Sequence, residues 1–243
     1  MFRNLSFSGR SVLITGGTYG LGKATAQLFA SLNAVVITVS RHPPAGAFSG
    51  HHFTADMADD AQVNELATLV LARFGCPDVL VNSAAVNLGS TLDDFDASKF
   101  AQELAVNLIA PTMLTGIFGR AMARLRHGSI VNVSSVRAVL PGNSVGYGMT
   151  KAALENLTRS AAVKYGSAGV RVNAVAPGPM DTTMLSAPNS AARNKTLSAN
   201  ALGKPIEIDD VASAIVFLSS QMASAITGVV LHVDAGHSLL GRY

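Results

Sequence analysis

Short apolar runs alternate with longer amphipathic stretches along the whole chain. The first run, Ser11–Thr15, is rich in β-branched residues and stops at two glycines, which is typical of a buried strand. Short apolar runs with polar, glycine or proline boundaries predict further strands at 34–40, 53–55, 79–81, 129–133, 170–175 and 228–233.

Helical spacing of apolar residues fills most of the intervals between these runs. Strands and helices that alternate this regularly predict an α/β fold, in which a parallel sheet carries helices on both faces. We expect one Rossmann-type doubly wound sheet of about seven strands. No repeat or linker divides residues 1–243, which are therefore expected to form a single domain. The predicted helices lie at 23–32, 61–74, 98–125, from 147 onward and at 208–219.

One polar stretch, residues 183–205, interrupts this alternation. It is rich in Ser, Asn and Ala and shows no strand pattern. We expect it to form a mobile flap over a binding site.

Composition narrows the class of protein. Of the 243 residues 49% are hydrophobic and 14% are charged, which is typical of a compact globular chain. No uncharged apolar run reaches the roughly 18 residues of a membrane span, and the N-terminus has no signal-peptide core. The single cysteine, Cys76, permits no internal disulfide and suits a reducing compartment, so we expect a cytoplasmic protein without a membrane anchor.

Two further classes of partner have little support. The net charge of +3 comes without a cluster of Lys and Arg, which argues against nucleic-acid binding. The six histidines and one cysteine show no metal-ligand spacing, so no metal site is expected. Residues 1–55 contain no Asp or Glu and could accept a polyanionic ligand without repulsion, although chance could also produce this in a sparsely charged chain.

The glycine-rich turn after the first strand suggests that this ligand is a dinucleotide. A strand, a glycine-rich turn and a helix let the backbone approach a pyrophosphate at the helix N-terminus. The spacing is G-x-x-x-G-x-G rather than the usual G-x-G-x-x-G. The residues of this turn expected to contact the cofactor are Gly16, Thr18, Tyr19, Gly20, Leu21 and Gly22.

The end of the second predicted strand indicates which dinucleotide would bind. An acidic residue there favours a free ribose 2′-hydroxyl, whereas an arginine accommodates a 2′-phosphate. This chain has Ser40 followed by Arg41 and no carboxylate. We therefore expect NADP(H), with a solvated loop arginine and NAD(H) as the alternative.

Tyr147 and Lys151 lie four residues apart at the start of a predicted helix, and therefore on one of its faces. A phenol has a pKa of about 10 and is a poor proton carrier at neutral pH. A cation about 4 Å away, at an effective dielectric constant near 20, would favour the phenolate by roughly 4 kcal/mol. That would bring the pKa of Tyr147 to about 7, which suits a general acid or base. The alternative is a surface tyrosine beside a solvated lysine.

Several short motifs, taken in order, resemble those of the short-chain dehydrogenase/reductase family over nearly the whole chain. Residues 15–22 are similar to its TGxxxGxG cofactor motif, and Tyr147–Lys151 matches YxxxK. Residues 82–85, Asn-Ser-Ala-Ala, resemble NNAG, residues 177–182 resemble PGxxxT, and 233–236 resemble VDGG with one glycine replaced. The resemblance is to the members that act as 3-oxoacyl-carrier-protein reductases, and it implies a homotetramer or homodimer.

The resemblance also implies a catalytic tetrad of Asn107, Ser135, Tyr147 and Lys151. Tyr147 would exchange the proton of the substrate hydroxyl, and Ser135, with Ser134 in reserve, would hydrogen-bond the carbonyl oxygen. Lys151 would hold the nicotinamide ribose and lower the pKa of Tyr147. Pro111 cannot donate to the carbonyl of Asn107, so that carbonyl could hold a water molecule that relays protons to Lys151.

The same resemblance extends the expected cofactor contacts beyond the glycine turn. Asp56 and Met57 would meet the adenine, Asn82 would support the floor of the site, and Thr182 would bind the carboxamide. The full set of further cofactor-binding residues is Asp56, Met57, Asn82, Ala84, Tyr147, Lys151, Pro177, Gly178 and Thr182.

These observations favour an NADP(H)-dependent oxidoreductase acting on a ketone or secondary alcohol, such as a 3-oxoacyl compound. The alternatives are an NAD-dependent alcohol dehydrogenase of the same family and a non-catalytic protein that senses the cofactor. The substrate is expected to be a small carbonyl or alcohol compound. Arg137, two residues after Ser135, could bind an anionic group of that substrate or could face solvent.

Overall fold

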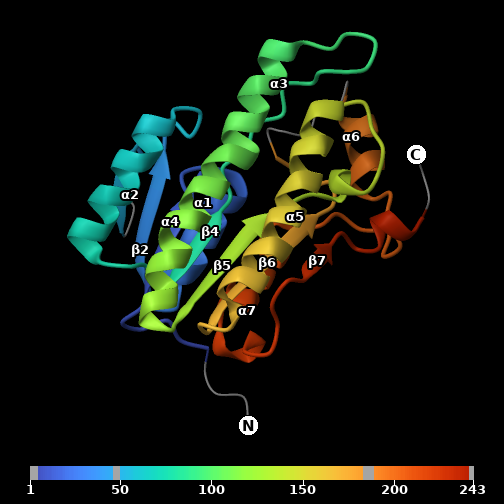
Figure 1. The fold of residues 1–243 in the computed structure, drawn as a ribbon. Helices are drawn as coiled ribbons and strands as arrows, with labels where there is room; N and C mark the ends of the chain where they lie inside the picture. The colour runs from blue at the N-terminus through green and yellow to red at the C-terminus, as the bar shows by residue number, and fades with distance from the viewer. Residues whose placement is uncertain (1–4, 46–49, 183–188, 241–243) are drawn as a thin grey trace.

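Seven parallel strands form one sheet in the order β3-β2-β1-β4-β5-β6-β7. The computed structural model describes residues 5–45, 50–182 and 189–240 (Figure 1). The sheet confirms the predicted α/β, doubly wound class. The strands are β1 (Ser11–Thr15), β2 (Val35–Ser40), β3 (His51–Thr54), β4 (Val79–Asn82), β5 (Gly128–Val133), β6 (Val170–Pro177) and β7 (Val230–Val233).

Helices cover both faces of the sheet, as Figure 1 shows. Helices α1 (Gly20–Ser31) and α7 (Ile208–Ser219) pack on one face. The opposite face carries α2 (Asp60–Phe74), α4 (Ala110–Leu125) and α5 (Val145–Gly166). The remaining helical segments are α3 (Ala97–Leu104), α6 (Ser190–Leu197), a π-helical turn η1 (Ala105–Ile109), and the 3-10 turns η2 (Val136–Ala138), η3 (Gln221–Ala223) and η4 (His237–Leu239).

Alternation along the strands divides the core into two layers. In β1, Leu13 packs with the α2, α4 and α5 side, whereas its neighbours Val12 and Ile14 pack with the α1 and α7 side. Successive strand side chains point to opposite faces, so a strand that is apolar throughout serves both layers. Phe29 on α1 and Phe118 on α4 are fully buried, and each such side chain contributes about 1.5–3 kcal/mol of hydrophobic stabilisation.

Helices α3 and α4 run together through the π-helical turn η1. At its end the amide of Ala110 donates to the carbonyl of Ala105, five residues earlier. Pro111 follows at once and supplies no N–H, which accounts for the change of helical pitch at this point. By length and composition residues 97–125 could cross a membrane, but Leu114 and Phe118 are fully buried in the core.

The order of the strands places a crevice at the carboxyl ends of β1 and β4. The chain leaves β1 toward α1 on one face and leaves β4 toward α3 on the other. In an open α/β sheet, ligands bind outside the carboxyl ends of the strands at such a switch point. The loops after β1 and β4 therefore border the site described below.

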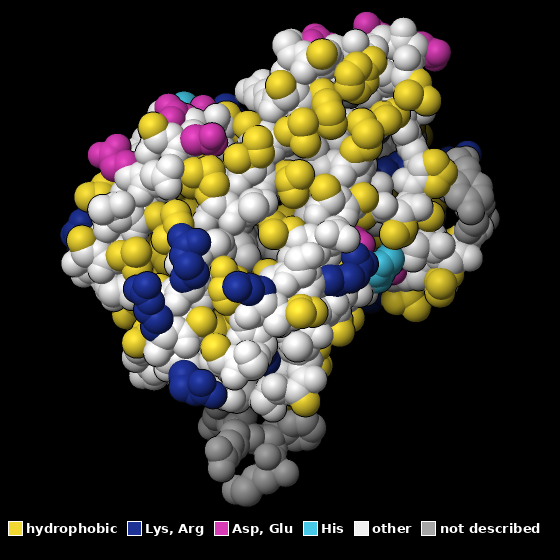
Figure 2. Space-filling model, viewed as in Figure 1, with side chains coloured by type: hydrophobic (Ala, Val, Ile, Leu, Met, Phe, Trp, Pro, Cys, Tyr) yellow, Lys and Arg dark blue, Asp and Glu magenta, His cyan; other side chains and the backbone are white. Residues whose placement is uncertain are grey.

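Cationic side chains gather away from that crevice, at the C-terminal ends of α4 and α5. Figure 2 shows Lys and Arg side chains over the lower half of this face. Arg124 lies in the last turn of α4 and Lys164 in the last turn of α5. The C-terminus of a helix carries partial negative charge, so these cations stabilise the helices by about 0.3–1 kcal/mol each.

The expected flap contains a helix that the sequence pattern did not predict. Helix α6 begins after Asn189, whose side-chain oxygen accepts from the amide of Ala192. Its polar sequence has no apolar face, and within it only Leu197 is buried, so periodicity gave no signal. Residues 183–188 of the expected flap lie outside the described residues.

Two glycines of α4 predict opposite effects of the same substitution. A Cβ on Gly119 would lie 2.5 Å from Cε2 of Tyr165 on α5, whereas the nearest atom to a Cβ on Gly116 is 3.9 Å away. Gly119→Ala should therefore destabilise the protein by about 1–3 kcal/mol through overpacking. Gly116→Ala, the matched control, should stabilise it by up to about 1 kcal/mol through helix propensity. Urea unfolding of both variants checks this, and equal shifts would contradict the α4–α5 packing.

Candidate active site

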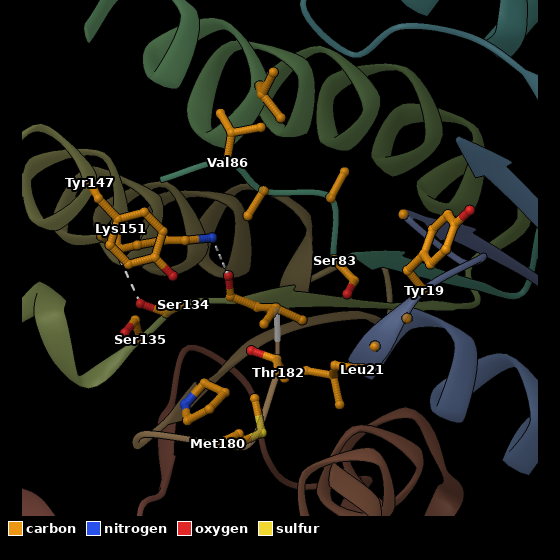
Figure 3. Close-up of a pocket in the computed structure, with 18 of the residues that line it drawn as sticks. Tyr19, Leu21, Ser83, Val86, Ser134, Ser135, Tyr147, Lys151, Met180 and Thr182 are labelled. Carbon is orange, nitrogen blue, oxygen red and sulfur yellow. Dashed lines mark hydrogen bonds between the residues drawn. The ribbon is translucent and has the colours of Figure 1, made fainter. Parts of the chain in front are cut away.

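A cavity of about 560 Å³ runs along the carboxyl ends of the strands. It is bordered by the loop after β1, the tip of β2, the loop after β4, the end of β5, the first turns of α5 and the residues after β6 (Figure 3). Every residue expected from the sequence to bind cofactor lines it except Asn82. Of the expected tetrad, Ser135, Tyr147 and Lys151 line it and Asn107 does not.

The glycine turn after β1 is shaped for a close backbone approach. Gly16 has a φ of 68°, which favours glycine, and a Cβ on Gly22 would lie 2.2 Å from the carbonyl oxygen of Gly16. The hydroxyl of Thr15 accepts from the amides of Ser83 and Ala84, both at 3.0 Å, and so ties this turn to the loop after β4. A pyrophosphate suits such a turn, because the glycines let the backbone at the N-terminus of α1 approach it closely.

The tip of β2 forms the far end of the cavity. The Thr18 hydroxyl donates to the Ser40 hydroxyl at 2.9 Å, and that hydroxyl donates to the carbonyl of His42 at 2.6 Å. These bonds fix the strand end from which Arg41 projects, and Arg41 also lines the cavity. Among the described residues of this tip no carboxylate is present, which fits a phosphorylated ribose.

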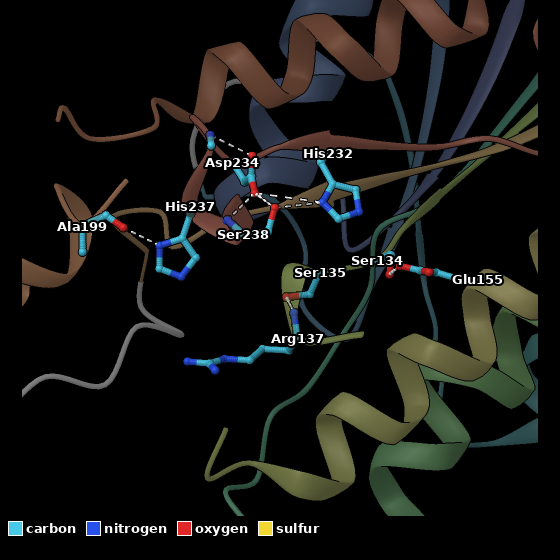
Figure 4. A network of polar contacts seen from close by, with 10 residues as sticks. Ser134, Ser135, Arg137, Glu155, Ala199, His232, Asp234, His237 and Ser238 are labelled. Atoms are coloured by element: carbon cyan, nitrogen blue, oxygen red, sulfur yellow. Dashed lines mark hydrogen bonds and ion pairs between the residues drawn. The ribbon is translucent and has the colours of Figure 1, made fainter. Parts of the chain in front are cut away.

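At the end of β5 the two neighbouring serines point in different directions. The Ser134 hydroxyl donates to Oε1 of Glu155 on α5 at 2.9 Å, and Ser134 is buried. The Ser135 side chain instead makes a hydrogen bond with Tyr147. Of the two serines that the sequence offered for this role, Ser135 is therefore the one that lies beside the tyrosine. Figure 4 shows Ser134 beside Glu155.

Tyr147 and Lys151 lie on the same face of α5, and both are almost wholly buried, with 8% and 2% of their surface exposed. The Lys151 ammonium donates to the carbonyl of Val133, at the end of β5, at 2.7 Å, and lies 5.5 Å from the centre of the Tyr147 ring. Figure 3 shows both side chains directed at the end of β5 beside Ser134 and Ser135. The i, i+4 spacing thus places the phenol and the ammonium side by side at the end of β5.

The pKa of Tyr147 moves in the direction opposite to our expectation. Burial raises it to about 12, with a further increase from the charge of Glu103, whereas the bond to Ser135 and the charge of Arg137 lower it. Burial also lowers the pKa of Lys151 to about 7. The predicted pKa of about 7 for the phenol was wrong for this state, because desolvation of the phenolate outweighs the hydrogen bond from Ser135 and the charge of Arg137. The phenol is therefore protonated at neutral pH and can donate a proton.

Asn107 lies behind the cavity wall, where it joins three segments. Its Oδ1 accepts from the amide of Val86 and its Nδ2 donates to the carbonyl of Val86, both at 2.9 Å. Nδ2 also donates to the hydroxyl of Thr150 at 3.1 Å, and that hydroxyl donates to the carbonyl of Tyr147 at 2.8 Å. The side chain therefore fixes the loop after β4 against α5, and the expected relay through its main-chain carbonyl stays a prediction.

Asn82 lies beneath the cavity, inside the sheet. Its Nδ2 donates to Oδ1 of Asn132 on β5 at 2.8 Å, and Nδ2 of Asn132 donates to the hydroxyl of Thr158 on α5 at 2.9 Å. All three residues are buried. This chain of bonds holds β4, β5 and α5 together under the site, as a supporting floor would.

A buried acidic residue near the tyrosine escaped the sequence reasoning. Glu103 on α3 is fully buried and its Oε1 accepts from the amide of Leu88 at 2.6 Å. Its other oxygen has no hydrogen-bond partner among the described residues, and a Cβ on Gly146 would lie 2.3 Å from it. The one available signal was a glutamate within an apolar helix, paired with a glycine immediately before Tyr147.

Other residues of the cavity were also missed, because strand-end loops show no periodicity. Val86, Val136 and Met180 add apolar surface to the cavity, and Thr196 reaches it from α6. Within the described part of the chain, no three His, Cys, Asp or Glu side chains are grouped so that they could hold a metal ion. The lining of the cavity includes hydroxyl groups and the cationic side chains of Arg41, Arg137 and Lys151.

Comparison with known proteins gives one family. The family model described as enoyl-(acyl carrier protein) reductase matches residues 16–238. Cis-4-hydroxycyclohexanecarboxylate dehydrogenase from Sinomonas cyclohexanicum is 34% identical, over 96% of this chain and 98% of its own. The 3-oxoacyl-(acyl-carrier-protein) reductase FabG of Escherichia coli is 31% identical over the same shares of the two chains.

A solved structure is similar in the same way. The gluconate 5-dehydrogenase from Burkholderia cenocepacia, in complex with NADP and tartrate, superposes with a TM-score of 0.90. It is 28% identical, and the match covers 97% of each chain. The similarity therefore extends over nearly the whole chain.

The burial of Lys151 predicts a dependence of stability on pH. Its folded pKa of about 7 lies below its ordinary 10.5, so between these values the unfolded state binds more protons and stability rises with pH. Lys151→Met should therefore gain stability over the wild type below pH 7 and lose that gain, on the order of a few kcal/mol, as pH rises toward 10. Guanidinium unfolding at several pH values measures the difference. Lys164→Met, an exposed lysine on the same helix, should show no such trend, and a pH-independent difference for Lys151→Met would contradict the assignment.

Proposed function

This chain belongs to the short-chain dehydrogenase/reductase family and is an oxidoreductase of that family; from that premise we propose that it is an NADP(H)-dependent enzyme that interconverts a ketone and a secondary alcohol. The observation that carries the proposal is the buried phenol of Tyr147, hydrogen-bonded to Ser135 in a cavity that also contains the Lys151 ammonium. A protonated phenol beside a second hydroxyl can bind and protonate a carbonyl oxygen.

The nicotinamide cofactor, when bound, supplies the hydride, and the chain's own residues handle oxygen and proton. The hydroxyls of Tyr147 and Ser135 would both donate to the substrate carbonyl oxygen, and the phenol would release its proton as negative charge develops there. The Lys151 ammonium would hold the ribose hydroxyls and favour the phenolate that remains. Asn107 would keep Tyr147 in place through Thr150.

NADP(H) is proposed over NAD(H) because of the tip of β2. Arg41 is available for a phosphate, Ser40 occupies the strand end, and the described residues of the tip include no carboxylate to repel one. The similar gluconate 5-dehydrogenase is described in complex with NADP. The turn at Gly16 and Gly22 would hold the pyrophosphate, with Asp56 and Met57 at the adenine and Thr182 at the carboxamide.

We propose a small carbonyl or alcohol substrate, 3-oxoacyl compounds among them, and a single cytoplasmic domain that forms a homotetramer or homodimer. Exposed apolar side chains on the outer surface of α4 and α5 support the oligomer: Leu125 is 64% exposed and Val163 is 85% exposed. Paired helix faces would remove this surface from water. Light scattering that gives the mass of a monomer would contradict it.

Tyr147→Phe tests the catalytic role. Without the phenolic proton, kcat for carbonyl reduction should fall by about 10²- to 10⁴-fold, the usual contribution of a general acid. The dissociation constant for NADPH, followed by fluorescence, should change little, because the aromatic ring is retained. Tyr165→Phe makes the same change further along α5, outside the cavity, and should keep its turnover. A cofactor-sensing protein would show no turnover in either form, and full activity of Tyr147→Phe would refute the mechanism.

Arg41→Ala tests the choice of cofactor. Loss of a charge-assisted contact to the 2′-phosphate should raise the KM for NADPH by about 10- to 100-fold and leave that for NADH nearly unchanged. Steady-state kinetics with both cofactors give the ratio. Arg73→Ala removes an exposed arginine outside the cavity and serves as the control. Equal effects of Arg41→Ala on the two cofactors would exclude the proposed preference.

A further inference from the structure

One charged side chain in the cavity has no role in the chemistry proposed so far. The charged residues that line the cavity are Arg41, Asp56, Arg137 and Lys151. Three of them are accounted for by the cofactor and by proton transfer. Arg137 is left over, and it lies at the substrate end, two residues beyond Ser135.

Arg137 lies in the turn that follows Ser135, close to the reacting groups. It belongs to the 3-10 turn η2, which the Ser135 side chain caps by accepting from the amide of Arg137 at 3.2 Å. Its charge is close enough to Tyr147 to favour the phenolate. Figure 4 shows its side chain extending away from Ser135, on the side of the site where His237 lies.

The guanidinium is held in place while most of its donors stay available. Nη1 donates to the carbonyl of Pro141 at 2.6 Å, and a Cβ on Gly142 would lie 2.4 Å from Nη1. A guanidinium has five N–H donors, so the one bond to Pro141 leaves several N–H groups available for a ligand. Arg137 makes no ion pair within the described part of the chain, and the side chain is exposed.

The carboxylates of Asp181 and Glu103 do not pair with Arg137. Asp181, beside Thr182, forms an ion pair with Arg193. Glu103 accepts from the amide of Leu88 and lies behind the wall, against Gly146. An arginine that is anchored at one nitrogen, exposed to the cavity and unmatched by protein carboxylate is suited to a planar anion on a ligand.

We propose that the substrate is an oxo acid or hydroxy acid whose carboxylate binds Arg137 while its carbonyl or hydroxyl oxygen lies between Ser135 and Tyr147. This inference rests on the proposed oxidoreductase function and names the substrate class for it. The bound carboxylate would fix which ketone carbon faces the cofactor, so Arg137 is a specificity residue and not a proton carrier.

The test compares oxo acids with their methyl esters, which keep the ketone and lose the charge. Acetoacetate, levulinate and 4-oxocyclohexanecarboxylate, each with its ester, would be assayed with NADPH and NADH. The measure is the ratio of kcat/KM for acid over ester, because the ester keeps the ketone and so reports any effect of Arg137 that does not depend on the charge of the substrate. For at least one pair the wild-type ratio should exceed about 10, and Arg137→Ala should lower it by about 10- to 100-fold.

Two further variants separate this role from a general effect on folding. Gly142→Ala should lower the acid-to-ester ratio in part, because its methyl group would displace the guanidinium without removing the charge. Arg124→Ala, which removes an exposed arginine outside the cavity, should leave the ratio unchanged. Thermal unfolding of all variants should stay close to the wild type.

The outcomes distinguish the two proposals. If no acid or ester is turned over with either cofactor, the proposed function fails and the inference with it. If ketones are reduced but esters are preferred to acids, or Arg137→Ala leaves the ratio unchanged, the function stands and the anionic substrate is ruled out.

Discussion

The site depends on the burial of two ionisable side chains against the end of one strand. A buried ammonium is costly unless it is hydrogen-bonded, and Lys151 meets that condition through the carbonyl of Val133. That bond sets the distance between α5 and β5, and through it the position of Tyr147 one turn earlier. Desolvation then keeps the phenol protonated and weakens the charge on the lysine. The pair is thus suited to proton donation to a carbonyl oxygen.

Polar bonds inside the protein keep this geometry rigid. Asn107 joins the loop after β4 to α5, and Asn132 joins β4 to the same helix further along. Buried amide side chains are costly unless each finds partners, so these bonds determine one relative position of strand, loop and helix. The π-helical turn before Pro111 contributes to the same end, because it carries Asn107. A helix of uniform pitch would turn that side chain elsewhere.

The electrostatics of the cavity change from one end to the other. At the tip of β2 and at the glycine turn, Arg41 and the close-packed glycine backbone suit the phosphates of the proposed cofactor. At the opposite end two charges act on Tyr147 in opposite directions: the charge of Glu103 raises the pKa of the phenol and the charge of Arg137 lowers it. A substrate anion on Arg137 would reduce the effect of that cation on Tyr147 and make the phenol a weaker acid still. With such a substrate, its charge and the proton transfer would be coupled at this end.

Much of this arrangement follows from the sequence alone, because it depends on local periodicity. Short apolar runs predicted the seven strands, and the positions of glycines predicted the turn after the first of them. The helical period of 3.6 residues placed Tyr147 and Lys151 on one face. All of these patterns are properties of short segments. Arg41 could be placed at a strand end for the same reason. Two features went unpredicted because polar caps and isolated buried residues leave no periodic signal: helix α6, and Glu103 against Gly146.

The tertiary structure shows which serine faces the tyrosine, where the resemblance had given Ser135 first with Ser134 in reserve, and it alone decided which way the pKa of Tyr147 moves. Ser134 and Ser135 are identical in the sequence, and only the packing of Glu155 on α5 turns one of them away. The pKa was predicted from a charge at a set distance, but its direction depends on how much water the whole fold removes from the phenol. The desolvation of a buried group depends on every segment that packs around it, and a local sequence pattern does not show which segments these are.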